Sequence, residues 1–344
     1  MILTRPRAHA PFIILALCSL VAGCRSSTSP VSAQQSSAVL VALEDSKRVM
    51  WLGAHPDDEN AVSGLLARVK DVARKLYFVT LTPGENENTR ASDPISGRFT
   101  NPWGEPSAKR GSELGERRAA VFRTLAKRVY RVDGIDIGPF VNGPLSLAEL
   151  DALPPDAPFK GWVNEPPDLV IRKWANDVGG TPDAPKAYVV SLIRRWRPDA
   201  VIGWDEWCSG SGNPEHRAAA KLLHEAVKAA ADPLYPDPAH PAADAWKVKY
   251  VLAAAVVIPP LVECGYCKCQ GEPPSEQLEN IALDVHSDFY GAEYFDIKCR
   301  AISGYANAEQ DGDLTPTELA TIRANCPAEP FLEPSEPVRL LLSF

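Results

Sequence analysis

The sequence predicts an α/β fold in which helices cover both faces of a mostly parallel β-sheet. Short apolar segments alternate along the chain with amphipathic segments at helical spacing, which is the pattern of parallel strands joined by helical crossovers. The 344-residue chain is 45% hydrophobic and 23% charged, an ordinary composition for a globular protein. Two polar motifs, AHPDDE and NPEH, fall after predicted strands, where ligands bind in such folds.

The first half of the chain contains two predicted strands, each followed by a predicted helix. Residues 47–54 (KRVMWLGA) are apolar and β-prone, as expected of a buried strand. Residues 59–73 form the next predicted element, a helix, because their apolar residues recur at helical spacing. A second strand is predicted at 75–82 and an amphipathic helix at 112–129.

The second half repeats this alternation. A helix is predicted at 184–199, ended by a proline, and a third buried strand follows at 200–204 (AVIGW). The helix predicted at 214–231 begins with a proline, which suits the first helical turn. A fourth strand is predicted at 249–258.

The N-terminal segment is typical of export. Two arginines and an apolar run of about thirteen residues, too short to span a membrane, precede VAGC, which resembles a bacterial lipobox. We therefore expect a signal peptide at residues 1–23, a lipid-bearing Cys24, a Ser-rich tether at 24–38 and a cell-envelope location outside the cytoplasm. The alternative is a plain secretory signal. Residues 39–344 are interpreted as a single domain with a Pro-rich insertion around 138–186.

Six cysteines remain when Cys18, in the predicted signal peptide, and Cys24 are set aside. An even number of cysteines in an exported protein favours disulfides. A metal site in the CGYCKC segment is the alternative. These cysteines are Cys208, Cys264, Cys267, Cys269, Cys299 and Cys326. The formal net charge of −8 gives no indication of a nucleic-acid partner.

Two short motifs supply residues that suit a metal site. AHPDDE follows the first predicted strand and contains His55, Asp57 and Asp58, and NPEH ends with His216 at the start of a distant helix. Catalytic zinc sites take three protein ligands from imidazole nitrogens and carboxylate oxygens. A polar turn between strand and helix is the alternative, but three adjacent acids beside an apolar strand are costly without a cation or solvent.

Five segments together resemble the LmbE-like/PIG-L family of zinc-dependent N-acetylglucosaminyl deacetylases. They occur in the family's order over roughly residues 47–310, and AHPDDE is the most specific of them. In this sequence they read AHPDDE, VTLTPGE, RRWRPDAVIGW, NPEHRAAA and FDIKCRAISGYANAEQ. The resemblance implies a Rossmann-like α/β sheet and hydrolysis of an N-acyl group, usually the acetyl group of an amino sugar or glycan.

The resemblance also implies roles for individual residues. His55, Asp58 and His216 match the zinc ligands, and Asp57 matches the general base that takes a proton from the attacking water. Arg117, in LGERR, falls near a family arginine that shapes the substrate pocket. The alternative for Arg117 is a solvated helix charge.

The second motif departs from the family pattern. The family commonly has His-Pro-Asp-His where this chain has Asn213-Pro214-Glu215-His216. Asn213 can still donate a hydrogen bond to a developing oxyanion, but it cannot carry positive charge. A family tyrosine two residues earlier is replaced by Ser211. Two other functions therefore remain open: a non-catalytic carbohydrate-binding envelope lipoprotein, and a metal-dependent amidase with a non-sugar substrate.

Residues 307–318 partly match the calcium loop of an EF-hand. The matching positions are Asn307, Glu309, Asp311, Gly312, Asp313 and Glu318. An acidic loop between two helices is the alternative that we favour.

Overall fold

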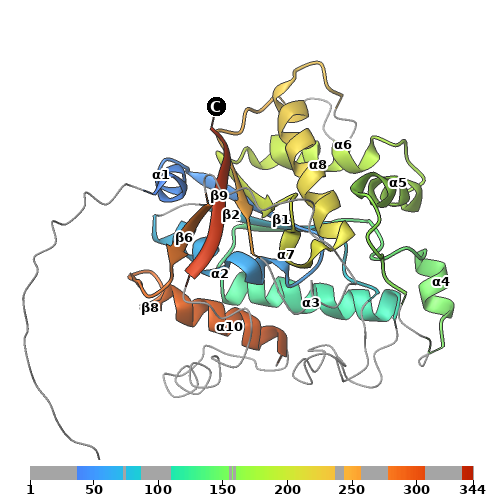
Figure 1. The fold of residues 1–344 in the computed structure, drawn as a ribbon, viewed down its shortest axis with the longest axis horizontal. Coiled ribbons are helices and arrows are strands. Elements are labelled where there is room, and N and C mark those ends of the chain that lie inside the picture. The colour runs from blue at the N-terminus through green and yellow to red at the C-terminus, as the bar shows by residue number, and fades with distance from the viewer. Residues whose placement is uncertain are drawn as a thin grey trace, which may run out of the picture. The chain divides into compact units, whose positions relative to one another are not determined.

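The computed structural model describes residues 37–72, 75–86, 110–154, 157, 160–236, 244–256, 278–306 and 335–343. Seven strands form the main sheet in the order β3-β2-β1-β4-β5-β9-β6 (Figure 1). They are β1 (Arg48–Gly53), β2 (Lys75–Thr80), β3 (Gly134–Ile137), β4 (Ala200–Trp204), β5 (Tyr250–Ala254), β6 (Leu278–Ala282) and β9 (Ser335–Ser343). Strands β1 to β5 run parallel, whereas β9 is antiparallel to both β5 and β6. The predicted α/β class with a mostly parallel sheet is confirmed.

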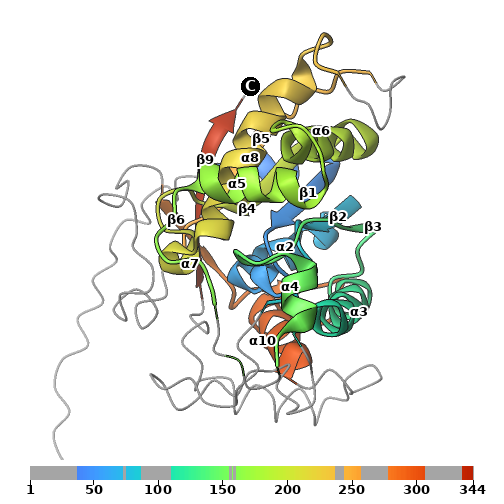
Figure 2. The same cartoon turned by 90° about the vertical axis from the view of Figure 1, so that its right-hand side faces the viewer.

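Helices cover both faces of the sheet (Figures 1 and 2). One face carries α1 (Ala38–Glu44), α2 (Ser63–Asp71), α3 (Ser112–Arg128) and α10 (Tyr294–Ala306). The other carries α5 (Pro167–Asp177), α6 (Ala184–Trp196) and α8 (Pro214–Ala231). Strand β1 serves both faces, because successive side chains of a strand point to opposite sides. Val49 and Trp51 pack on the first face, and Met50 and Leu52 on the second.

The Pro-rich segment around 138–186 contributes to the core. It contains α4 (Leu147–Ala152), α5 and the first residues of α6. Val170 and Trp174 of α5 are fully buried against the second face. This segment, which the sequence marked as an insertion, therefore helps to bury the sheet.

Several boundaries differ from the predictions for local reasons. The helix predicted from residue 59 begins as a 3-10 helix, η1 (Asp58–Val62), and becomes α-helical at Ser63. Ser37, expected in the tether, caps α1 by accepting a hydrogen bond from the Leu40 N–H. Several other elements were not predicted from the sequence. These are α1, α4, α5, α7 (Ser209–Gly212), β3, β6, β7 (His286–Ser287), β8 (Ala292–Glu293) and β9.

Some predictions lie outside the described residues. These are the signal peptide, the lipidated Cys24, the CGYCKC cluster, Cys326 and the calcium loop at 307–318. Cys208 and Cys299 are both disulfide-bonded, and the pairing of the cysteines stays a prediction. Within the part of the chain that is described, no helix has the length and apolar character that crossing a membrane requires.

Candidate metal centre

The two sequence motifs meet because β1 and β4 are neighbours in the sheet. These strands run parallel, with Leu52 opposite Gly203, so their carboxyl ends lie at the same edge. The AHPDDE loop follows β1. The loop after β4 leads through α7 into α8, whose first turn carries His216. This edge is where open α/β sheets place their ligands.

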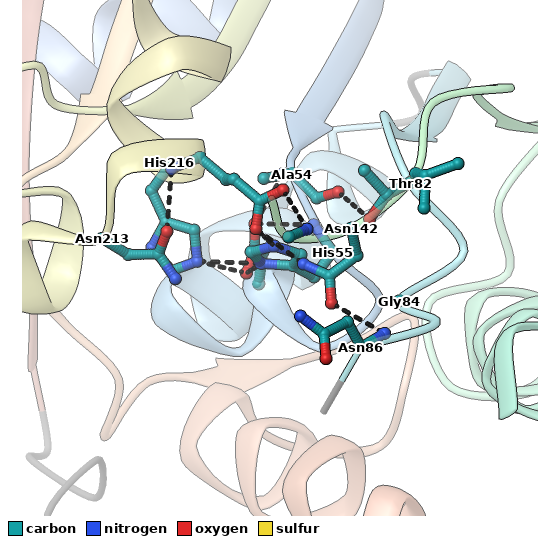
Figure 3. Close-up of polar contacts among 12 residues, drawn as sticks. Ala54, His55, Thr82, Gly84, Asn86, Asn142, Asn213 and His216 are labelled. Carbon is teal, nitrogen blue, oxygen red and sulfur yellow. Dashed lines mark hydrogen bonds and ion pairs between the residues drawn. The ribbon is translucent and has the colours of Figure 1, made fainter. Parts of the chain in front are cut away.

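His55, Asp58 and His216 form a cluster that could hold a metal ion. Nδ1 of His55 lies 3.1 Å from Nε2 of His216. Oδ1 of Asp58 lies 3.5 Å from the first nitrogen and 3.1 Å from the second. Ligands about 2.0 Å from a tetrahedral zinc ion stand about 3.3 Å from one another. The three atoms therefore have the spacing of three corners of such a site. Figure 3 shows His55 and His216 in this cluster.

Hydrogen bonds orient both imidazole rings toward this point. Nε2 of His55 lies 2.9 Å from Oε2 of Glu215, and Nδ1 of His216 lies 2.8 Å from the carbonyl oxygen of Ser209. Both partners are acceptors, so these two ring nitrogens carry the protons. In neutral rings, the lone pairs of the other two nitrogens then face each other and Oδ1 of Asp58. Three converging electron pairs require a cation or a proton between them.

A loop from the segment around 138–186 forms hydrogen bonds with both oxygens of Glu215. Its Oε2 accepts a hydrogen bond from the Asn142 side-chain amide at 2.6 Å, and its Oε1 accepts one from the Gly143 N–H at 2.8 Å. Lys173 of α5 donates to the Val141 carbonyl oxygen at 3.0 Å, which fixes the same loop. A carboxylate that orients a ligating histidine is the usual outer layer of a metal site.

The two carboxylate oxygens of Asp58 have different partners: Oδ1 faces the two histidines, and Oδ2 accepts hydrogen bonds. Its Oδ2 accepts hydrogen bonds from the Ala54 N–H at 2.6 Å, the His55 N–H at 3.1 Å and the Trp204 indole N–H at 2.9 Å. The Trp204 ring also stacks on His216, with centroids 4.5 Å apart and planes at 4°. Oδ1 is thereby directed at the two imidazoles.

The buried charges of the cluster favour a cation. Burial would raise the pKa of Asp58, yet the charges and hydrogen bonds of His216 and His55 hold it well below its usual value. Burial would likewise raise the pKa of Glu215, and its bonds to His55 bring it below the usual value. Burial opposes a charged His55, but Asp58 and Glu215 raise its pKa well above the ordinary value. Two buried carboxylates thus stabilise positive charge at this point.

Asp57 precedes Asp58 in the same loop, but its side chain has different surroundings. Its backbone has φ of 97°, a conformation that aspartate tolerates better than most residues. Its side chain is 37% exposed, against 3% for Asp58, and its Oδ2 lies 3.2 Å from Nη2 of the buried Arg118. The adjacent aspartates therefore occupy different environments, as the predicted division into base and ligand requires.

The structure places the Arg118 guanidinium beside the Asp57 carboxylate. Arg118 also donates to the carbonyl oxygens of Pro56 and Gly84 at 2.9 and 3.1 Å. A Cβ at Gly84, where φ is 82°, would lie 2.5 Å from the Arg118 guanidinium, so only glycine leaves room for this contact. The pocket role of Arg117 stays a prediction.

Asn213 stands at the start of α8, beside His216 (Figure 3). Its Oδ1 accepts a hydrogen bond from the Glu215 N–H at 2.8 Å and so caps the helix. The capping bond assigns Oδ1 as the acceptor, which leaves the amide nitrogen to donate. This agrees with the donor role expected of Asn213, which stays a prediction.

Sequence reasoning missed several residues that support the cluster. Glu85 is 4% exposed and accepts a hydrogen bond from the Asn142 N–H at 3.1 Å. Burial and the charge of Glu215 raise its pKa to about 7. Glu85 and Glu215 belong to the motifs TPGE and NPEH, where an acid was visible. Asn142 had no sequence signal, because its role depends on a loop that is distant in the chain.

Comparisons with known proteins show the family to which this chain is related. Residues 50–227, more than half of the chain, match the family PIG-L, described as GlcNAc-PI de-N-acetylase. Relatives named 1D-myo-inositol 2-acetamido-2-deoxy-alpha-D-glucopyranoside deacetylase include proteins from Geodermatophilus obscurus and Rhodococcus opacus. The first is 29% identical over 60% of this chain, and the alignment spans 60% of its own length. The second is 26% identical over 67% of this chain and 69% of its own length.

Among solved structures, N,N'-diacetylchitobiose deacetylase from Pyrococcus horikoshii is similar with a TM-score of 0.47 and 14% identity. The comparison covers 88% of this chain and 86% of that protein. The family match spans β1 through most of α8 and so contains His55, Asp57, Asp58 and His216. On the strength of that match, this chain belongs to the PIG-L (LmbE-like) family of GlcNAc deacetylases.

Proposed function

We propose that this protein is a zinc-dependent N-deacetylase that removes an acetyl or similar acyl group from an N-acetylglucosamine-type sugar or glycoconjugate. The observation that carries the proposal is the convergence of His55 Nδ1, Asp58 Oδ1 and His216 Nε2 at the spacing of a tetrahedral site. Two imidazoles and one carboxylate are a donor set that zinc accepts, with one position left for chemistry. The names of the family and of the curated relatives support the amino-sugar substrate.

The proposed mechanism gives each residue a separate task. His55, Asp58 and His216 would hold the zinc ion, which when bound acts as a Lewis acid toward water and the acyl oxygen. Asp57 accepts a proton from the attacking water and passes it to the leaving amine. The side-chain amide of Asn213 donates a hydrogen bond to the oxygen that becomes negative. Arg118 holds the Asp57 carboxylate in position.

Acetate release from a panel of N-acetylglucosamine compounds tests the proposal. The panel contains free N-acetylglucosamine, N,N'-diacetylchitobiose and an inositol-linked N-acetylglucosamine. Activity should be lost after chelation and restored by about one equivalent of zinc per chain. Sugar binding without acetate release would favour the non-catalytic carbohydrate-binding alternative. Release from simple amides but from none of the sugars would favour the non-sugar amidase.

We further propose that the protein is a lipid-anchored component of a bacterial cell envelope, facing outside the cytoplasm. The support is the sequence around Cys24: basic residues, a short apolar run and VAGC. A Ser-rich segment after Cys24 would serve as the tether.

A further inference from the structure

We propose that strand β9, which lies beyond the family-matched residues 50–227, positions both metal-binding segments of the site. Two of its side chains do this from opposite faces of the sheet, Glu336 toward the His55/Asp58 segment and Arg339 toward the His216 segment. This inference rests on the metal site of the proposed function. It assigns Glu336 and Arg339 as positioning residues, which act through the segments that they hold.

Glu336 anchors the segment that carries His55 and Asp58. Its side chain is fully buried and accepts hydrogen bonds from the N–H groups of Gly64 at 2.9 Å and Leu65 at 2.8 Å. These are free donors of the first turn of α2, where a carboxylate is favoured. Since α2 continues directly from the 3-10 helix that starts at Asp58, fixing its first turn also limits how far Asp58 can move.

Lys298 of α10 completes this anchor. Its Nζ lies 3.2 Å from Oε1 of Glu336, and both side chains are almost fully buried. A buried carboxylate is costly unless its charge is balanced and its oxygens are hydrogen-bonded. With Lys298 and two backbone N–H groups as partners, Glu336 meets both conditions, so its position is well determined.

Arg339 anchors the segment that carries His216. It forms an ion pair with Asp205, which is 1% exposed and follows the last residue of β4. Asp205 in turn accepts a hydrogen bond from the Trp207 N–H at 2.6 Å, and its carbonyl oxygen accepts one from the Ser209 hydroxyl. The Ser209 carbonyl oxygen is the group that orients His216. A chain of contacts therefore runs from β9 to the ligand.

The strand geometry explains how one strand reaches both segments. Residues three apart in a strand point to opposite faces, and the packing agrees, since Val338 lies in the core beside α2 and α10 and Leu341 packs on the other face. Strand β9 pairs with β5 through Arg339 opposite Ala253, and β5 adjoins β4. Glu336 and Arg339 thus contact the two metal-binding segments from opposite faces of the sheet.

The consequence concerns the metal-free protein. If the ligand segments were loose before metal binding, ordering them would cost conformational entropy and weaken the affinity for zinc. Anchors that hold both segments in advance reduce this cost. Loss of either anchor should therefore weaken zinc binding and loosen one segment, not both.

The test uses the full-length protein with Glu336→Gln, Arg339→Gln, Asp205→Asn and, as a matched control, Val338→Ala. Val338 is fully buried in the same strand but contacts neither segment through a polar bond, so its truncation reports the effect of a weakened β9. Zinc affinity is measured by competition with a chromophoric chelator, unfolding by denaturant, and amide hydrogen exchange in the metal-free protein.

We expect Glu336→Gln and Arg339→Gln to weaken zinc binding about tenfold or more, the usual effect of losing an outer partner. Amide hydrogen exchange should rise at residues 55–65 in Glu336→Gln and at residues 205–213 in Arg339→Gln. Asp205→Asn should resemble Arg339→Gln. Val338→Ala should lower stability with zinc affinity unchanged. Wild-type zinc affinity in Glu336→Gln and Arg339→Gln would overturn the inference. A loss of zinc affinity no larger than that of Val338→Ala, in variants of the same stability, would overturn it as well.

The outcomes also separate this inference from the proposed function. A wild-type protein that binds no zinc defeats the proposed function. A wild-type protein that binds zinc, with variants that bind it equally well, defeats only the role of β9. If Glu336→Gln does not fold, Arg339→Gln and Asp205→Asn still decide the question for the His216 segment, and wild-type zinc affinity in both overturns the two-sided proposal.

Discussion

Nδ1 of His55 and Nε2 of His216 lie 3.1 Å apart, although 161 residues separate them in the chain. The hydrogen bonds to Glu215 and to the Ser209 carbonyl oxygen place protons on the opposite sides of both rings. The facing nitrogens can therefore both act as metal ligands without any change of ring orientation. This relationship makes the roles of the neighbouring acids testable one at a time.

The two adjacent aspartates should fail in different ways. Asp58→Asn removes an anionic ligand, so zinc content and deacetylation should both fall. Asp57→Asn keeps the size of the side chain but loses the basic oxygen, so zinc should stay near one per chain while kcat drops by roughly 10²–10⁴. Metal analysis and acetate-release rates on the two variants decide this. Loss of zinc from Asp57→Asn, or its turnover at the wild-type rate, would contradict the assigned roles.

Glu215→Gln should weaken zinc binding by about 10–100-fold, the usual effect of losing the partner of a ligating histidine. His55, Asn142 and Gly143 all direct donors at the Glu215 carboxylate, and an amide cannot accept at both ends. Glu225→Gln is the matched control, because Glu225 lies on the same helix with its side chain 44% exposed. Chelator competition on both variants measures the effect. Equal zinc affinity in the two would show that Glu215 does not support His55.

Asn213→Ser should separate helix capping from oxyanion stabilisation. Serine can replace the capping oxygen, but it has no amide N–H₂ to donate. We expect zinc content and the denaturation midpoint to change little, while kcat falls by about 10²–10³, the usual loss for one oxyanion donor. Steady-state kinetics together with a denaturation curve provide the measurement. An unchanged kcat would remove Asn213 from the catalytic group.

Glu85 should make the metal-free protein less stable as the pH rises toward neutrality. Its pKa of about 7 in the folded state exceeds the ordinary value, so between the two values the folded state binds more protons than the unfolded state. The free energy of unfolding therefore decreases as the pH rises through this window. Denaturant unfolding of wild type and Glu85→Gln from pH 4.5 to 8 tests it. The variant should show a shallower decrease, and parallel curves would rule out the contribution of Glu85.

Cys24→Ala should abolish lipid attachment and release the protein from membranes. A lipobox requires the cysteine as the site of modification, and several acyl chains anchor a protein firmly. Metabolic labelling with a palmitate analogue and membrane fractionation in a bacterial host measure both effects. If processing and membrane association are unchanged in the variant, the segment is a plain secretory signal or has another role.

The strands and helices that the sequence predicted share a strong local pattern. The fully buried run of β4 and the amphipathic spacing of α3 and α8 are visible because parallel strands are apolar throughout and crossover helices have one apolar face. The four-residue β3 and the antiparallel β6 lack such a pattern. Their pairing depends on partners elsewhere in the chain, which no local window contains.

For the candidate metal centre, the sequence by itself predicted the ligand types and their approximate place. His55, Asp58 and His216 follow strand ends, and parallel strands bring their carboxyl ends to one edge. Only the tertiary structure decided which residues support them. Glu215, Arg118, Glu336 and Arg339 act through contacts between segments far apart in the chain. Hydrogen bonds and ion pairs of this kind depend on distance and direction in the folded chain, whereas periodicity reports only which face of an element is buried.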